Sequence, residues 1–204
     1  MQIADYMDNL RREKGLLTIA EVVALSQRGN VIFDPYSALI SRLARIGKDN
    51  VFYPGVSLFC SEAGSLVLGD CNILHASTLI EASLGGVSIG AGNQFGEGGF
   101  TLRANRPGAI VTIGDEGRYM NGASVFGETF LGSGSQILGA IAVDNCRLEG
   151  GGSYRSLDPD ARAGLLKGFG AARGLVVPQG HVIVGAGIFL ASAQELQSVY
   201  HPRS

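Results

Sequence analysis

The sequence predicts a mainly β protein built as a parallel β-helix, in which short strands and tight turns form coils that stack. Bulky residues recur every six positions between Ile89 and Val143, and the unbroken part of this series is Ile113, Tyr119, Val125, Leu131, Ile137 and Val143. A period of six fits neither the period of about 3.6 of a helix nor the plain alternation of a single strand. Since one six-residue unit cannot bury its apolar residue alone, neighbouring units must stack and share a core.

Glycine is the second observation that predicts this fold. The chain has 31 glycines among 204 residues, about twice the average share. Gly90, Gly96, Gly114 and Gly132 each follow a member of the six-residue series. The corners of a coil need backbone shapes that a side chain would obstruct, and glycine allows them. The glycines therefore indicate repeated corners and not disorder.

Three six-residue units resemble a known repeat, in which an aliphatic residue precedes a small one, two variable ones and then Ser, Thr, Ala or Val. They are Leu131–Gln136, Val125–Phe130 and Leu74–Leu79. The pattern is similar to that of the hexapeptide-repeat family. The resemblance implies a left-handed parallel β-helix of triangular section, an exception to the usual right-handed crossover. It also implies an acyltransferase, because most members of the family transfer an acyl group from acetyl-CoA or another acyl thioester.

Three segments are expected along the chain. Residues 1–48 have few glycines and read as a helical N-terminal cap, with a capping box at Thr18 and Glu21 and a further helix start at Asp34-Pro35. Residues 49–190 form the β-helix, which a loop and helix insertion at 149–174 interrupts before the last coil. Residues 191–204 form a C-terminal tail, for which a helix is one option.

Composition excludes several classes of protein. The formal net charge of −2 comes without a basic cluster, so no nucleic-acid partner is expected. No apolar run reaches the roughly 20 residues of a membrane span, and the first 15 residues lack the apolar block of a signal peptide. Cys60, Cys71 and Cys146 are odd in number and scattered, which indicates reduced thiols. We therefore expect a cytoplasmic protein.

A histidine is the usual general base for acyl transfer, because its pKa lies near neutrality. The chain has only His75, His181 and His201. His75 follows Leu74 near a corner, where its side chain can face outward, so it is the first candidate for the catalytic base. Glu97 and Glu128 are weaker candidates for the same role.

The family resemblance also extends to the last coil. Residues 176–187 are similar to the final coil of hexapeptide acyltransferases, which implies coenzyme contacts at Gly185 and Ala186, although the chain departs from the family pattern after Gly185. The insertion before this coil carries Arg155, Arg162, Lys167 and Arg173. Since phosphates need positive charge, Lys167 and Arg173 are the expected contacts for the phosphates of acetyl-CoA or another acyl-CoA.

Two other functions compete with acyl transfer. A coil with so few histidines could be a non-catalytic binding or assembly scaffold, because glycine-rich spacing specifies the coil and not an activity. A zinc enzyme of the carbonic anhydrase type needs three converging histidines, and their scattered positions predict no metal site. The family resemblance further implies a homotrimer with a small-molecule acceptor, such as a sugar or an amino acid.

Overall fold

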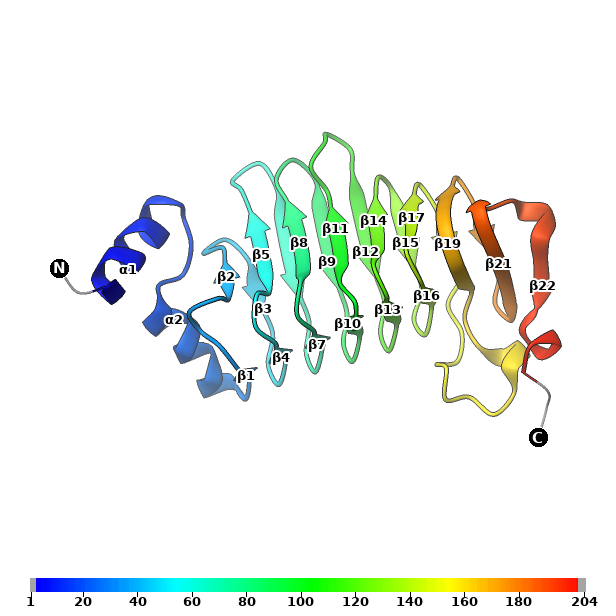
Figure 1. The fold of residues 1–204 in the computed structure, drawn as a ribbon, viewed down its shortest axis with the longest axis horizontal. Helices are drawn as coiled ribbons and strands as arrows, with labels where there is room; N and C mark the ends of the chain where they lie inside the picture. The colour runs from blue at the N-terminus through cyan, green and yellow to red at the C-terminus, as the bar shows by residue number, and fades with distance from the viewer. Residues whose placement is uncertain (1–2, 202–204) are drawn as a thin grey trace.

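The computed structural model describes residues 3–201 and shows a stack of parallel coils with helices at one end (Figure 1). Each coil contributes one short strand to each of three faces. The strands of the first face are β1 (Val31–Ile32), β4 (Val51–Phe52), β7 (Ile73–Leu74), β10 (Gln94–Gly96), β13 (Arg118–Met120) and β16 (Gln136–Leu138). Those of the second face are β2 (Leu39–Ile40), β5 (Ser57–Cys60), β8 (Thr78–Ala82), β11 (Phe100–Arg103), β14 (Ala123–Phe126) and β17 (Ile141–Asp144).

The third face is a separate seven-stranded sheet. Its strands are β3 (Arg45–Ile46), β6 (Ser65–Leu68), β9 (Gly86–Ile89), β12 (Ile110–Ile113), β15 (Thr129–Leu131), β18 (Arg147–Leu148) and β20 (Val176–Val177). Two longer strands, β19 (Leu165–Arg173) and β21 (His181–Ile188), run across the first and second faces without a break. The prediction of a mainly β, parallel β-helix is confirmed, and the architecture is consistent with the left-handed form.

The six-residue series lies along the inside of the coil. Its unbroken members occupy β12 to β17 in turn, and each is at most 2% exposed. Within this series a coil takes 18 residues, since Arg118 pairs with Gln136. The preceding coil is longer, because Gly86 pairs with Ile110 across a loop at 104–109. Pro107 falls on the six-residue count but lies in this loop, which explains why it is not a bulky core residue.

A column of buried asparagines joins the early coils at one corner. Asn30, Asn50, Asn72 and Asn93 are each at most 3% exposed, and each Oδ1 accepts hydrogen bonds of 2.8 to 3.1 Å from the next coil. The column ends at Gly117, whose N–H donates to Asn93. These bonds satisfy backbone groups that the tight corner would otherwise leave unpaired.

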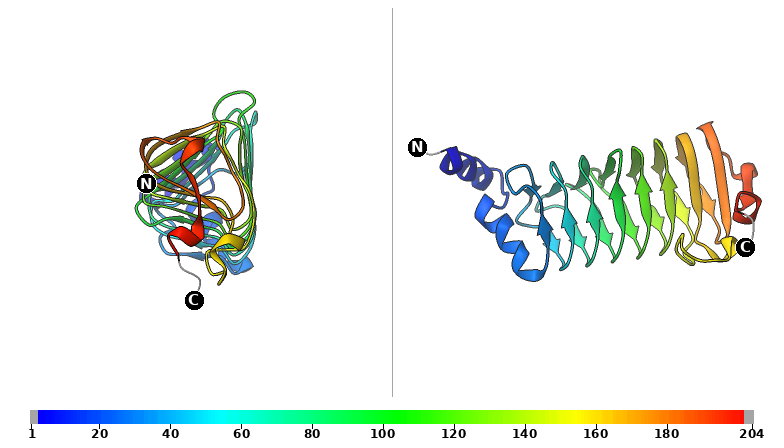
Figure 2. Two further views of the ribbon diagram at one scale, coloured as in Figure 1. Left: turned by 90° about the vertical axis from the view of Figure 1, so that its right-hand side faces the viewer. Right: turned by 60° about the horizontal axis from the view of Figure 1, so that its bottom comes forward.

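The helical N-terminal segment is shorter than the sequence predicted, since it ends at Arg28 and not near residue 48. Helix α1 (Ile3–Glu13) and helix α2 (Ile19–Ala24) lie at the end of the stack (Figure 2), and a 3-10 helix at Leu25–Arg28 follows. The capping box at Thr18 and Glu21 is confirmed. No described helix is long and apolar enough to cross a membrane.

The prediction of a helix after Asp34-Pro35 is wrong. Asp34 instead holds a turn, with its Oδ1 accepting from the backbone N–H of Tyr36 at 3.0 Å. The apolar stripe that follows becomes β2 and β3, and the coiled region starts at Val31. The spacing of these apolar residues fits a helix as well as strands. Pairing of β2 with β5 and of β3 with β6 favours the strands.

The helix expected within the insertion is also wrong. Its residues Leu165 and Leu166 belong to β19 and pair with β16, so the departure from the coil covers 149–164 and contains a 3-10 helix at Pro159–Ala161. In the tail, β22 (Gln194–Leu196) pairs antiparallel with β21, between 3-10 helices at Ala191–Ala193 and Gln197–Val199. This pairing covers the open edge of the last coil.

Candidate functional site

His75 stands on the outer side of the first face, directly after β7. Its ring stacks on that of Tyr53 in the preceding coil, with 4.8 Å between ring centroids and 26° between planes. Its Nε2 lies 3.8 Å from Oε1 of Glu97 in the following coil. The side chain of His75 is 20% exposed and that of Glu97 is 60% exposed. The ring is therefore fixed on one side and faces a carboxylate on the other.

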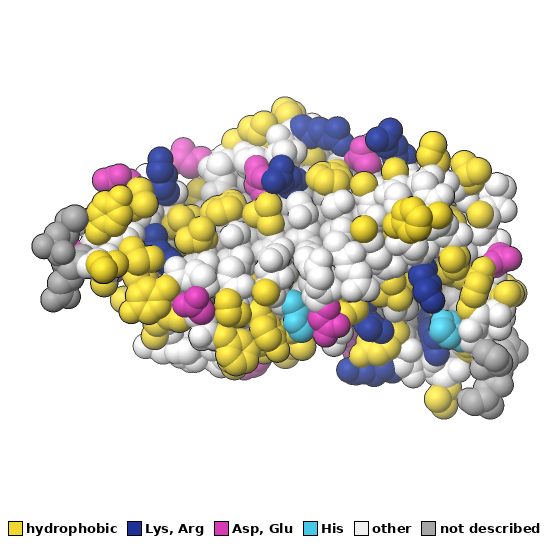
Figure 3. All heavy atoms as spheres, in the orientation of Figure 1, with side chains coloured by type: hydrophobic (Ala, Val, Ile, Leu, Met, Phe, Trp, Pro, Cys, Tyr) yellow, Lys and Arg dark blue, Asp and Glu magenta, His cyan; other side chains and the backbone are white. Residues whose placement is uncertain are grey.

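The His75 ring is the last in a row of neighbouring aromatic rings. Phe33, Tyr53 and His75 take equivalent places in three successive coils, and the Phe33 and Tyr53 centroids are 4.9 Å apart. In Figure 3 a patch of hydrophobic side chains lies at the lower edge, beside a histidine and an acidic side chain. The row stops at Gly96, where a Cβ would lie 2.6 Å from Cβ of His75. Glycine is thus needed there because the backbone passes close to Cα and Cβ of His75 and has a φ of +103°.

Lys167 and Arg173 lie on different faces of the coil, although both belong to β19. Lys167 pairs with Leu138 on the first face, in the same outward row as His75. It stands four strands from His75, or about 19 Å at the usual strand spacing. Arg173 pairs with Asp144 on the second face. The structure therefore does not bring the two cations together.

Gly185 and Ala186 lie in β21, where the strand bends from the first face to the second. They pair with Gly168 and Phe169 of β19. A Cβ on Gly168 would lie 1.9 Å from the carbonyl oxygen of Gly185. The close approach of two backbones explains Gly168, whereas a Cβ on Gly185 would lie 3.3 Å from the ring of Phe189.

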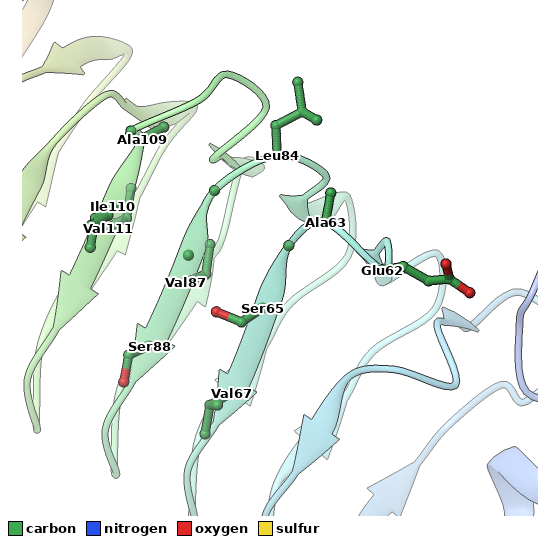
Figure 4. A pocket seen from close by; sticks show the side chains of 14 residues that line it. Glu62, Ala63, Ser65, Val67, Leu84, Val87, Ser88, Ala109, Ile110 and Val111 are labelled. Carbon is green, nitrogen blue, oxygen red and sulfur yellow. The ribbon is translucent and has the colours of Figure 1, made fainter.

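The third face carries two shallow grooves. The first, of about 560 Å³, is lined by small and branched residues of β6, β9 and β12 and by the loops that precede these strands, with Leu84 on one loop (Figure 4). The second, of about 490 Å³, is lined by Glu128, Phe130 and Arg147. Glu128 is therefore on a different face from His75.

A smaller cavity of about 140 Å³ lies between the first face and the loop at 149–164. Arg118 of β13 and Arg155 of the loop line it, and the ring of Tyr154 lies 4.1 Å from the guanidinium carbon of Arg118 and 5.1 Å from that of Arg155. Arg118 and Tyr154 were not among the residues singled out from sequence. The sequence does mark Arg118 in one way. Gly117 takes the place that an asparagine of the column has in earlier coils, so the column ends directly before Arg118.

Three of the remaining histidines and cysteines have structural explanations. Nδ1 of His181 is 2.8 Å from the carbonyl oxygen of Gln179. Burial raises the pKa of the Cys60 and Cys146 thiols, which makes them poor nucleophiles. Within residues 3–201 there is no group of three or more metal-ligating side chains.

Comparisons with known proteins give weak structural matches and no sequence relative. No protein-family model and no curated protein matches the chain. Ten chains of solved structures match, among them UDP-N-acetylglucosamine O-acyltransferase (LpxA) from Moraxella catarrhalis. That match has 14% identity and a TM-score of 0.28, and it covers 76% of this chain and 67% of the other. Similarity this low carries no argument about the reaction or the substrate.

Proposed function

We propose that the protein is an acyltransferase that moves an acyl group from a thioester to the hydroxyl or amine of a small acceptor. The observation that carries the proposal is the pairing of His75 with Glu97, 3.8 Å between Nε2 and Oε1. Among the described residues, His75 is the only histidine with a carboxylate within 4.0 Å. A general base needs such a fixed orientation, together with a group that stabilises the imidazolium once the proton has moved.

Acetyl-CoA is the acyl donor to test first. Lys167 lies in the outward row of His75, about 19 Å away, so a ligand extended along this face could reach both residues. Its thioester would lie at His75 and its phosphates near Lys167. Arg173, Gly185 and Ala186 would be met only where the ligand passes the corner toward the second face.

The proposal includes a homotrimer, because His75 lies on an open surface of the single chain. Apolar side chains of the last coils support self-association. Phe169, Val184, Ile188 and Leu190 are between 40% and 79% exposed, and soluble monomers rarely expose large contiguous apolar patches. Light scattering should therefore give about three chain masses, and a monomer at all working concentrations would exclude a shared site.

A non-catalytic scaffold is the second candidate function. The grooves of about 560 and 490 Å³ lie on the third face, away from His75. The ring of His75 also continues the row of Phe33 and Tyr53, which would suit a purely packing role. Binding of an acyl-CoA distinguishes the two functions, because a scaffold has no need of one.

The experiment measures CoA and acetyl-CoA binding by titration calorimetry, followed by thiol release in the presence of sugars, amino sugars and amino acids. The wild type should bind the coenzyme and release thiol with at least one acceptor. His181→Ala is the matched control, since His181 is held by the Gln179 carbonyl at the far end of the coil. If the wild type gives no heat at millimolar coenzyme, the scaffold replaces the acyltransferase.

A further inference from the structure

The cavity under the 149–164 loop is lined by two arginines that form no ion pair within residues 3–201. It is lined by Gly92, Gln94, Glu116, Gly117, Arg118, Ser153, Tyr154 and Arg155. Within residues 3–201, neither Arg118 nor Arg155 has a carboxylate oxygen within 4.0 Å of its guanidinium. Arg155 is exposed and its charge is solvated, whereas Arg118 is half-buried. The unpaired guanidinium of Arg118 beside a small cavity therefore calls for an explanation.

Arg118 is the more unusual of the two. Its Nε is buried and has no hydrogen-bond partner among the described residues. One terminal nitrogen, Nη2, donates only to the sulfur of Met120 at 3.4 Å, which is a weak acceptor. A half-buried cation with such poor partners costs free energy. Contact with the Tyr154 ring offsets some of that cost.

Other arginines of the chain show what a structural role looks like here. Arg147 also lies over an aromatic ring, 4.2 Å from the centroid of Phe130, but its Nε donates to Glu149 at 2.6 Å. Arg162, in the same loop as Arg155, donates to the carbonyl oxygen of Ser156. Arg118 and Arg155 lack such partners, and their charge is opposed only incompletely by the single carboxylate of Glu116 that lines the cavity.

We propose that this cavity is an oxyanion-binding site, in which Arg118 and Arg155 hold a phosphate or carboxylate group beside Tyr154. Guanidinium groups suit such anions, because their N–H donors match the spacing of the oxygens. The volume of about 140 Å³ is below the roughly 300 Å³ at which pockets for whole ligands begin. The site therefore takes the charged group of a ligand and not the whole molecule.

The site lies on the same face as His75. Arg118 pairs with Gln94, which pairs with Ile73, two residues before His75. From strand spacing and rise per residue, Arg118 and His75 are about 12 Å apart at Cα. If His75 is the catalytic base, an assignment that rests on the proposed function, this anion is the charged group of the acceptor. The acceptor class is then a phosphorylated or carboxylated small molecule.

The test is binding of inorganic phosphate and of acetate to the full chain without any coenzyme, at constant ionic strength because salt screens such contacts. Binding is followed by calorimetry and by the rise in thermal midpoint. The wild type should bind one or both anions at millimolar concentration. Arg118→Met and Arg155→Ala should each weaken binding about ten-fold or more, and Glu116→Gln should tighten it about two- to five-fold.

Arg147→Gln is the matched control and should leave anion binding unchanged. Arg118→Met should also keep the thermal midpoint of the free protein, since it removes a poorly paired charge. The proposal is overturned if the wild type binds neither anion, or if Arg147→Gln weakens binding as much as Arg118→Met. Tighter phosphate binding assigns a phosphate ester, and tighter acetate binding a carboxylate. Because no coenzyme is present, the result of this anion-binding test does not depend on whether the protein is an acyltransferase.

Discussion

The side-chain oxygen of Asn50 accepts two hydrogen bonds from Asn72 in the next coil, at 2.8 Å from the backbone nitrogen and 3.1 Å from the side-chain nitrogen. Asn72 repeats the arrangement toward Asn93. Each asparagine is buried and serves as the partner of the next, so the stability of one corner depends on its neighbours.

Replacing Asn72 by alanine should therefore destabilise the fold by about 2–4 kcal/mol. The change leaves Oδ1 of Asn50 without its side-chain donor and the backbone N–H of Asn93 without its acceptor, both in the buried column. Urea unfolding measures the difference. Asn105→Ala, on the exposed loop, should change stability little, and equal losses for the two variants would contradict the role of the column.

The corner between β19 and β21 gives a second prediction. Gly168 has φ +125°, and a Cβ there would lie 1.9 Å from the Gly185 carbonyl oxygen, so Gly168→Ala should cost about 3 kcal/mol or more. Gly108 has φ +78° with nothing within 4 Å of the added Cβ. Gly108→Ala should then cost only the backbone strain of about 1–2 kcal/mol. Similar losses at both sites would mean that contact between the strands is unimportant.

The coil could be predicted from the sequence because the bulky residues from Ile113 to Val143 are spaced by the geometry itself, one to each strand. The asparagine column also left a signal, since Asn30, Asn50, Asn72 and Asn93 each precede a strand of the first face at intervals of 20 to 22 residues. Residues 39–46 could not be assigned in this way. Their apolar spacing fits a helix as well as two strands, and only pairing with later coils decides between them.

The candidate site was only partly predictable. His75 could be found because histidines are few and its place near a corner indicated an outward side chain. Its partner Glu97 comes from the next coil, and the sequence does not fix which outer positions become neighbours when coil lengths vary. The loop at 149–164 is irregular for the same reason, so the approach of Tyr154 to Arg118 depends on tertiary structure that no local pattern encodes.

The contact between Glu21 and Arg42 predicts a pH dependence. Hydrogen bonds from Arg42 and from the backbone of Thr18 lower the pKa of Glu21 from 4.5 to about 2. A lowered pKa means that the stabilisation is complete above pH 4.5 and is lost as the pH falls toward 2. Both side chains are about 40% exposed, so solvent limits the effect to about 1 kcal/mol or less. Unfolding of the wild type and Glu21→Gln should differ at pH 6 and converge near pH 2, whereas a constant difference would contradict it.

The last prediction separates chemistry from coenzyme binding at the proposed site. His75→Ala should lower turnover about 10²- to 10⁴-fold, the usual contribution of a general base, and should leave CoA affinity nearly unchanged. Lys167→Ala should weaken CoA binding by about 1–3 kcal/mol if the lysine contacts a phosphate, because Lys167 lies in the outward row of His75. Arg173→Ala should have the smaller effect, since Arg173 lies beside Asp144 on the second face. Calorimetry on the three variants measures these affinities. A larger loss at Arg173 than at Lys167 would mean that the coenzyme runs along the second face, and His75 would then be too far from the thioester to act as its base.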